Sequence, residues 1–161
     1  MGQCRRLSRP GPFDDTAGVS AEAQVCQACG LCCDGSLFAR VPLTAEDRAP
    51  SALTVDTKPN GARSIRQRCT ALSGTCCTVY EERPTACRGY TCLLYEAVRS
   101  GEETLTGAVG IVAKAKVLTA AVQPSLTEAR VAASKEDARP DPALEKAEAW
   151  LQFHFLGHRR A

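Results

Sequence analysis

Cysteine is the residue type in this chain that is most able to do chemistry, and it is clustered. Residues 26–33 read CQACGLCC, so four of the ten cysteines lie close together. The C-x2-C spacing lets one tight stretch of backbone direct two sulfurs at one ion, and zinc accepts four such sulfurs in a tetrahedron at about 2.3 Å. A C-x2-C-x2-C run also opens the bacterial ferredoxin motif, whose thiolates hold an iron–sulfur cluster. The spacing therefore predicts a metal or cluster site, with Gly30 where backbone that folds tightly often needs a positive φ.

A second group of cysteines lies in the stretch CTALSGTCCTVYEERPTACRGYTC, residues 69–92. Its members are Cys69, Cys76, Cys77, Cys87 and Cys92. Neighbouring side chains usually diverge, so the adjacent cysteines at 32 and 33 indicate two nearby sites or one multinuclear site. Four cysteines from each region would complete two four-thiolate sites and leave one of the 76–77 pair over.

Two alternatives to metal binding are a disulfide framework and inert buried thiols. The N-terminal stretch MGQCRRLSRPGPFDD has no apolar run after its arginines, so we expect no secretory signal and a cytoplasmic location. In a reducing cytosol, clustered thiols bind metal or do redox chemistry more often than they form structural disulfides. Adjacent cysteines also pair poorly with each other. Inert thiols would not explain so regular a spacing.

Other functional classes find little support in the sequence. The net charge of +2 is no basis for a nucleic-acid partner, and no run approaches the ~20 apolar residues of a membrane span. His154 and His158 are four residues apart but lack the acidic partner of a zincin motif, so we interpret them as a solvated helix end. No GxSxG, P-loop or dinucleotide motif is present. We therefore do not expect the chain to be an enzyme on its own, and we expect its partners to be metal ions.

Composition and patterning predict a small, mostly α-helical domain organised around irregular, metal-binding cysteine loops, with little β structure. Hydrophobic residues make up 44% of the chain but aromatic residues only 5%, so bound metal would supplement a thin core. We expect a loose tail over residues 1–19, a metal-binding region over 20–100, and a helical C-terminal extension over 101–161 that packs on the cysteine region.

Several local signals refine this prediction. Ser20 is expected to cap a short helix that leads into Cys26. Thr44, with Asp47 three residues later, is a weak variant of a capping box and predicts another helix start. A turn over 59–61 precedes a short predicted strand over 62–68. Two further helices are predicted from apolar residues at helical spacing. The first contains Ala108, Ile111, Ala115, Leu118 and Val122 and is expected to stop at Pro124. A linker with Pro140 and Pro142 separates it from the second, which contains Leu144, Ala147, Leu151 and Phe155.

The cysteine pattern resembles that of the YkgJ-type cysteine-cluster family, described as a zinc- or iron-chelating CxxCxxCC domain. The first motif matches at residues 26–33, including the glycine, and a second matches at Cys69 and Leu72. The run C-x-[IV]-Y-x-x-R-P-x-x-C-R-x-[FY]-x-C matches at Cys77, Val79, Tyr80, Arg83, Pro84, Cys87, Arg88, Tyr90 and Cys92. The segment VPLTAED is also similar to the family's. The resemblance covers about residues 24–95, and Cys4 and Cys76 are extra to it.

The resemblance implies eight metal ligands, with Cys77 chosen over Cys76 by motif register. They are Cys26, Cys29, Cys32, Cys33, Cys69, Cys77, Cys87 and Cys92. The expected function is coordination of zinc or iron, in as many as two all-cysteine sites, through the CxxCxxCC cluster and the downstream C-x9-C-x4-C motif. The alternative is an iron–sulfur protein that transfers electrons or serves a redox enzyme. Thiol redox sensing by Cys4, Cys76 or Cys77 is a minor third hypothesis.

Charged and aromatic residues between the cysteines also have predicted roles. Arg83 and Arg88 lie where thiolates would leave excess negative charge, so they either offset that charge or pair with Glu81 or Glu82 on the surface. Pro84 is interpreted as setting a turn. The tyrosines at 80 and 90 are expected to pack as local core.

Overall fold

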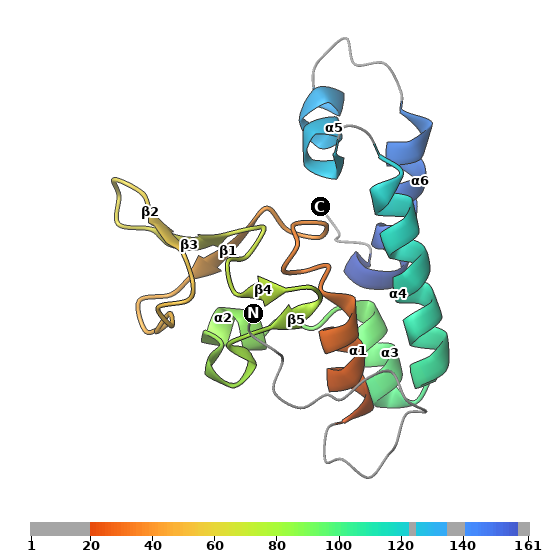
Figure 1. The fold of residues 1–161 in the computed structure, drawn as a ribbon, viewed down its shortest axis with the longest axis horizontal. Coiled ribbons are helices and arrows are strands. Elements are labelled where there is room, and N and C mark those ends of the chain that lie inside the picture. Colours follow the sequence, from red (N-terminus) through yellow and green to blue (C-terminus); the bar gives the residue numbers. More distant parts are fainter. Residues whose placement is uncertain (1–19, 123–124, 135–140, 158–161) are drawn as a thin grey trace.

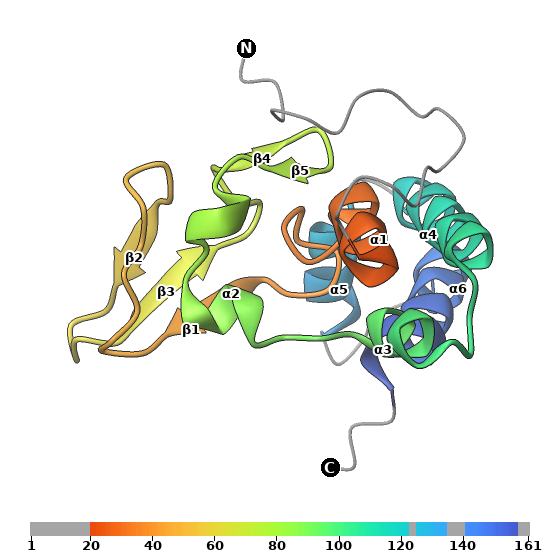
Figure 2. The same ribbon diagram turned by 90° about the horizontal axis from the view of Figure 1, so that it is seen from below.

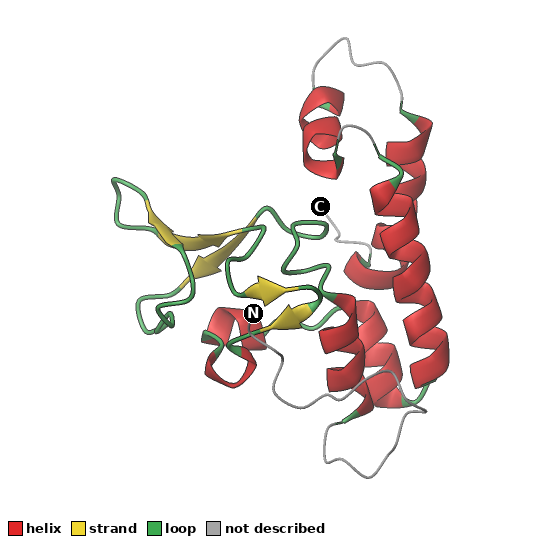
Figure 3. Ribbon diagram, viewed as in Figure 1, coloured by secondary structure: helices red, strands yellow, loops and turns green. Residues whose placement is uncertain are grey.

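The structure is a computed structural model that describes residues 20–122, 125–134 and 141–157. Its helices are α1 (Ala21–Cys29), α2 (Thr85–Arg88), α3 (Leu93–Ser100), α4 (Leu105–Ala120), α5 (Leu126–Ala133) and α6 (Pro142–Leu151), with a 3-10 turn η1 (Tyr80–Glu82) and a π-helical turn η2 (Gln152–Leu156). Its strands are β1 (Arg40–Leu43), β2 (Val55–Thr57), β3 (Arg63–Arg66), β4 (Leu72–Ser73) and β5 (Cys76–Cys77). Helices dominate the described residues and strands are short (Figure 3), which confirms the prediction of a mostly α-helical chain with little β structure.

The longer helices gather on one side of the molecule, around α4 (Figure 1). The buried residues of α4 are Ala108, Val112 and Ala115, which share one face of the helix. Because two of them are alanines, neighbouring helices approach closely, and α1, α3 and α6 pack beside α4 (Figure 2). The core continues into η2, where Phe155 is almost fully buried. None of the helices among the described residues is both long enough and apolar enough to cross a membrane.

Both predicted helical stripes lie in helices that contribute to this core. In the first, Ala108, Ala115 and Val122 are buried, while Ile111 and Leu118 pack at its edge. In the second, Leu144, Ala147, Leu151 and Phe155 are all buried. The helix that carries the first stripe, α4, ends at Ala120. Pro124 was predicted to stop this helix and lies outside the described residues. Pro140 also lies outside them.

Pro142 does not lie in a linker as predicted, because it is the first residue of α6. Asp141 precedes it and accepts hydrogen bonds from the backbone N–H groups of Ala143 and Leu144 at 2.9 and 3.3 Å. Proline is tolerated at this position because its missing N–H would have no partner in the helix and its φ is already helical. Pro142, which was predicted to lie in a linker, is therefore part of a helix start.

A small antiparallel sheet extends away from the helices (Figure 1), in the order β1-β3-β2. Its central strand β3 confirms the strand predicted over residues 62–68. Ile65 of this strand is 1% exposed and pairs with Val41 and Val55 on either side. These residues help to build a second, smaller core with Leu53 and Ala71. A separate hairpin, β4–β5, lies between the sheet and the helices (Figure 2).

The helix predicted to start at Thr44 is absent from the structure, which corrects that expectation. The local signal is nevertheless present, since the Asp47 carboxylate accepts hydrogen bonds from Thr44 N and Oγ1 at 2.9 and 3.1 Å. The chain does not continue as a helix because Pro50 follows, and the residue before a proline is disfavoured in helical geometry. Asp47 is also buried, at 3% exposed, where it meets another part of the chain.

Candidate metal centre

The first cysteine motif begins inside helix α1 and ends in the turn that follows it. Ser20 caps the helix as predicted, with its Oγ accepting a hydrogen bond from Ala23 N at 3.4 Å. The helix does not stop at Cys26, however, and continues through Cys29. The first two thiols are therefore one helical turn apart on a rigid element, and only the later part of the motif is a loop.

Gly30 ends α1 in the left-handed region, with φ of 72°, as its place in the motif predicted. A Cβ at this position would lie 3.2 Å from the Cα of Thr75, in the turn between β4 and β5. Glycine is needed there both for its backbone conformation and for this close approach. The end of the first cysteine motif's helix thus packs closely against the β4–β5 hairpin, which carries Cys77.

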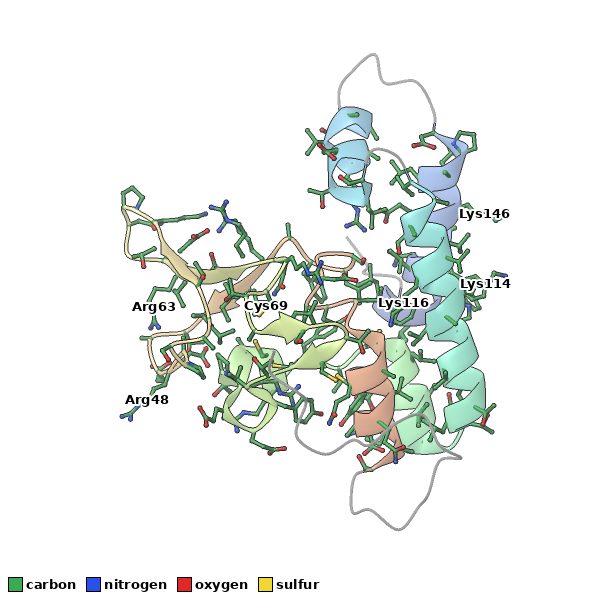
Figure 4. All side chains as sticks on the ribbon, in the orientation of Figure 1. Arg48, Arg63, Cys69, Lys114, Lys116 and Lys146 are labelled. Carbon is green, nitrogen blue, oxygen red and sulfur yellow. The ribbon has the colours of Figure 1, made fainter. Side chains whose placement is uncertain are left out.

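The two cysteine regions meet directly through their backbones. Cys69 N donates a hydrogen bond to Cys33 O at 2.8 Å. Cys69 itself lies between the three-stranded sheet and the β4–β5 hairpin (Figure 4). It is 8% exposed and belongs to the smaller core. Segments far apart in the sequence therefore hold their thiols side by side.

All eight cysteines assigned by the family resemblance line one cavity of about 490 Å³. They are Cys26, Cys29, Cys32, Cys33, Cys69, Cys77, Cys87 and Cys92. Cys76 is not among the residues that line it, although it is adjacent to Cys77. Cys4 lies outside the described residues. The nine cysteines that the structure describes are all free thiols, so none of them belongs to a disulfide.

The thiols fall into two sets according to which of them interact electrostatically. We call Cys26, Cys29, Cys32 and Cys92 the first set. Burial is the main cause that raises the pKa of Cys29 to about 12, and the thiols of Cys92 and Cys26 add to the increase. Burial likewise raises the pKa of Cys32, with contributions from the other three members and then from the adjacent Cys33.

We call Cys33, Cys69, Cys77 and Cys87 the second set. Burial raises the pKa of Cys33 to about 12, and the other three thiols of the set raise it further. The pKa of Cys87 is raised to about 11, again mainly by burial and then by Cys69 and Cys77. The adjacent Cys32 and Cys33 thus belong to different sets. The sets adjoin, because Cys26 also acts on Cys33.

The first set is carried by helices that pack on one another. Cys26 and Cys29 lie on α1, and Cys92 is the N-cap residue of α3, where its Sγ accepts a hydrogen bond from Tyr95 N at 3.4 Å. Burial raises the pKa of Cys92, and this hydrogen bond to its sulfur opposes the rise. Lys116 of α4 fixes the end of α1 by donating to Ala28 O at 2.8 Å.

The second set is carried by short, irregular elements. Cys33 lies in the turn after α1, Cys69 follows β3, Cys77 lies in β5 and Cys87 lies in α2. Leu72 joins two of these positions, because its N–H donates to Cys69 O at 3.1 Å and it pairs with Cys77 across the hairpin. Backbone hydrogen bonds and strand pairing therefore join three members of this set, Cys33, Cys69 and Cys77.

Arg83 is placed among the thiols of both sets. Burial raises the pKa of Cys26, and the nearby guanidinium of Arg83 opposes that rise by its charge and by hydrogen bonding. The same charge acts on Cys77 and Cys87. Arg83 Nε donates to Tyr80 O at 2.8 Å, and the guanidinium stacks 3.6 Å from the centre of the Tyr80 ring. The arginine is thus held where it can offset thiolate charge.

The alternative role for the two arginines, pairing with acidic neighbours, is not seen. In the described part of the chain, no ion pair joins Arg83 or Arg88 to Glu81 or Glu82. Tyr80 supports Arg83 rather than a hydrophobic core. Tyr90, in contrast, packs edge-on against Phe38 with ring centres 4.7 Å apart, as expected of a core residue.

The cavity suits a thiophilic metal in its chemistry but is not closed around an ion. Within residues 20–122, 125–134 and 141–157, no three His, Cys, Asp or Glu side chains are arranged so as to hold a metal ion. Thiolate sulfur binds zinc and iron–sulfur clusters equally readily, so the donor set fits either.

Gln67 is a lining residue that the sequence analysis did not identify. Its Oε1 atom is buried and has no hydrogen-bond donor among the described residues. A buried acceptor without a donor is unfavourable by about 1–3 kcal/mol, so this position favours a cavity occupant that carries a donor or a positive charge. Glutamine outside a recognised motif gives no signal in a single sequence.

His154 does not contribute to this site. It lies in η2, stacked against Trp150 with ring centres 4.1 Å apart, and is not among the residues that line the cavity. Burial lowers its pKa, with the charge of Lys114 adding to the effect. His158, four residues later, lies outside the described residues.

Comparison with known proteins agrees with this arrangement. A family profile for CxxCxxCC proteins, described as a "putative zinc- or iron-chelating domain", matches residues 25–106. The chain belongs to this family. The match begins within α1 and ends in α4, so it includes all eight cavity cysteines. Membership supports metal binding by this chain.

One curated protein is similar over part of its length. It is the "Uncharacterized protein YkgJ" of Escherichia coli O157:H7, 35% identical over 81 residues. The alignment covers 40% of this chain and 72% of that protein. No solved structure gives a significant match. The CxxCxxCC family match therefore supports metal binding in general.

Proposed function

We propose that this protein binds zinc or iron through two adjoining sets of four thiols. The observation that carries the proposal is that eight cysteines from separate parts of the chain line one cavity of about 490 Å³, while the neighbouring Cys76 does not. Bound metal would link α1 to α3 in the first set, and the turn after α1 to β5 and α2 in the second.

Metal binding at this cavity would be coupled to proton release. The raised pKa values of Cys29, Cys33 and Cys87 keep these thiols protonated at neutral pH in the metal-free protein. A metal ligand must be a thiolate, so each thiol loses its proton when it binds. Arg83 and the N–H of Tyr95 are the groups placed to stabilise the resulting charge.

An iron–sulfur protein is the second candidate, and two observations favour it. The thiols line a wide cavity without three of the described ligand side chains being spaced for one ion. Among the described residues, no histidine lines the cavity, and clusters are commonly held by cysteine alone. Such a group would supply one-electron chemistry, whereas four-thiolate zinc is redox-silent. In that case Arg83 would also affect the reduction potential.

Anaerobic purification of the full chain distinguishes the two candidates. Clusters would give a brown protein with broad absorption near about 400 nm and stoichiometric iron and sulfide. Zinc would give a colourless protein with about two zinc ions per chain. Cys29→Ala is expected to lose metal in either case and to lower the melting temperature, because binding and folding are coupled. Wild-type protein that holds neither metal, even after anaerobic loading, would contradict the proposal.

A further inference from the structure

The second set contains three thiols that the backbone ties together and one that it does not. Cys69 is bonded to Cys33, and Leu72 links Cys69 to the strand that carries Cys77. Cys87 lies instead on α2, which is only four residues long. The backbone bond that Cys87 donates is local, to Pro84 O at 2.9 Å. Something else must therefore hold α2 against the other three thiols.

Asp47 provides that link. Its Oδ1 accepts a hydrogen bond from Ala86 N at 3.4 Å, one residue before Cys87. Its Oδ2 is held by Thr44 N at 2.9 Å and Thr44 Oγ1 at 3.1 Å. The backbone of the same residue is held as well, because Arg63 Nη2 of β3 donates to Asp47 O at 3.3 Å. One buried side chain thus joins the segment after β1 to the element that carries the fourth thiol.

A carboxylate suits this position better than any other short side chain. Both of its oxygens accept, and here they accept from two different segments. Asparagine has one acceptor oxygen and would turn an NH₂ group towards the other N–H donors. The hydrogen bonds to Asp47, with the backbone N–H of Thr44 the largest contribution, lower its pKa, so the side chain is charged at neutral pH.

We propose that Asp47 is a positioning residue that fixes α2 so that Cys87 completes the second set. A site with four thiols is closed, whereas a site with three leaves a coordination position open. Asp47 therefore determines whether the second set closes. The metal part of this inference rests on the function proposed above, but the placement of Cys87 is a property of the metal-free chain and can be tested separately.

Site-resolved alkylation of the full-length, metal-free protein tests the placement. The Asp47 charge also raises the pKa of Cys87, so the rate constant compared is that of the Cys87 thiolate, taken from a pH series. Asp47→Asn is expected to raise this rate constant by roughly tenfold, the change associated with loss of about one charged hydrogen bond. The rates of Cys26 and Cys29, in the first set, are expected to stay within about twofold of wild type. Asp56→Asn is the matched control, because Asp56 is a carboxylate of the same sheet that bonds Arg40 and Arg66 instead of α2.

The inference is overturned if Cys87 reacts in Asp47→Asn as it does in wild type. It is also overturned if all eight cavity cysteines accelerate together, since Asp47 would then support the fold in general. Thr44→Val provides a second variant in case Asp47→Asn does not fold. It removes the Oγ1 donor at 3.1 Å and keeps the charge. It is expected to accelerate Cys87 selectively by a smaller factor, and an unchanged rate for Cys87 would again count against the proposal.

A metal-loaded measurement then connects Asp47 to the site. With zinc as the probe, wild type is expected to protect all eight thiols, and Asp47→Asn to leave Cys87 reactive while the first set stays protected. If the wild-type protein binds no metal, the proposed function is contradicted. The alkylation pattern of the metal-free protein would still decide whether Asp47 positions Cys87. The two ideas therefore fail in different experiments.

Discussion

Cys69 donates its backbone N–H to the carbonyl oxygen of Cys33 at 2.8 Å, and this bond joins two residues whose thiols both belong to the second set. A hydrogen bond between the two backbones fixes the spacing of their side chains before any metal is present. With Cys77 held through Leu72, the second set is largely arranged by the fold. Metal binding would then require adjustment of side chains more than movement of whole segments.

The adjacent cysteines of β5 allow a sharp test of ligand assignment. Cys77→Ala is expected to lower metal content and to destabilise the loaded protein by more than about 2 kcal/mol, because metal binding contributes to folding. Cys76→Ala is expected to change stability by less than about 0.5 kcal/mol, since its side chain does not line the cavity. Elemental analysis and denaturant unfolding check both, and equal losses in the two variants would reject the assignment of Cys77 alone.

The metal-free protein should lose stability as the pH is raised. Cys29 and Cys33 have pKa values of about 12 in the fold, against 9.0 for an ordinary thiol. A raised pKa contributes stability that is complete below the unfolded value and disappears as the pH rises through the folded value, because the unfolded chain ionises first. We therefore expect stability to fall progressively between about pH 9 and pH 12. Urea unfolding with chelator and reductant measures this, and a rise in stability over that range would contradict it.

The metal-loaded protein should show the opposite dependence on pH. Protons compete with metal for the thiolates, so metal is expected to be released as the pH falls below neutrality. Metal retained after gel filtration at a series of pH values measures the effect. Retention that is independent of pH down to about pH 4 would be inconsistent with thiolate ligands of this kind.

Arg83→Gln is expected to weaken metal binding at both sets. The guanidinium acts on Cys26 of the first set and on Cys77 and Cys87 of the second, so its removal leaves more uncompensated negative charge. We expect a loss of affinity of roughly tenfold, as for one charge at a partly exposed site. Arg66→Gln is the control, because Arg66 pairs with Asp56 on the sheet. Competition with a coloured chelator measures the affinities, and equal values for Arg83→Gln and wild type would exclude the charge-balancing role.

Two glycines with similar backbone angles separate strain from close packing. Gly30 and Gly61 have φ of 72° and 81°, but only Gly30 has a neighbour within reach of a new Cβ. Gly61→Ala is expected to lower stability by about 1 kcal/mol through backbone strain alone. Gly30→Ala is expected to lower it further and to reduce metal content, because the Thr75 backbone would be pushed away. Thermal unfolding compares them, and equal losses would show that the approach to Thr75 is unimportant.

Local signals were reliable where a single element determines the outcome. The cap at Ser20, the positive φ at Gly30, the strand around Ile65 and the buried helical stripes all depend on near neighbours in the chain. The predicted helix at Thr44 was wrong because Pro50 follows its cap closely. Asp47 also accepts a hydrogen bond from Ala86 N of α2, a contact that sequence spacing does not reveal. For the same reason Asp47 was read as a local cap and not as a link to Cys87.

By itself the sequence determined which cysteines are ligand candidates, because motif spacing and register are properties of the linear chain. It also indicated either two nearby sites or one multinuclear site, because adjacent side chains usually diverge. Only the tertiary structure decided the membership of the two sets. Cys92 follows Cys87 closely in sequence, yet its thiol interacts with Cys26 and Cys29, because α3 packs against α1. Contacts between helix faces depend on the whole core, and no local pattern encodes them.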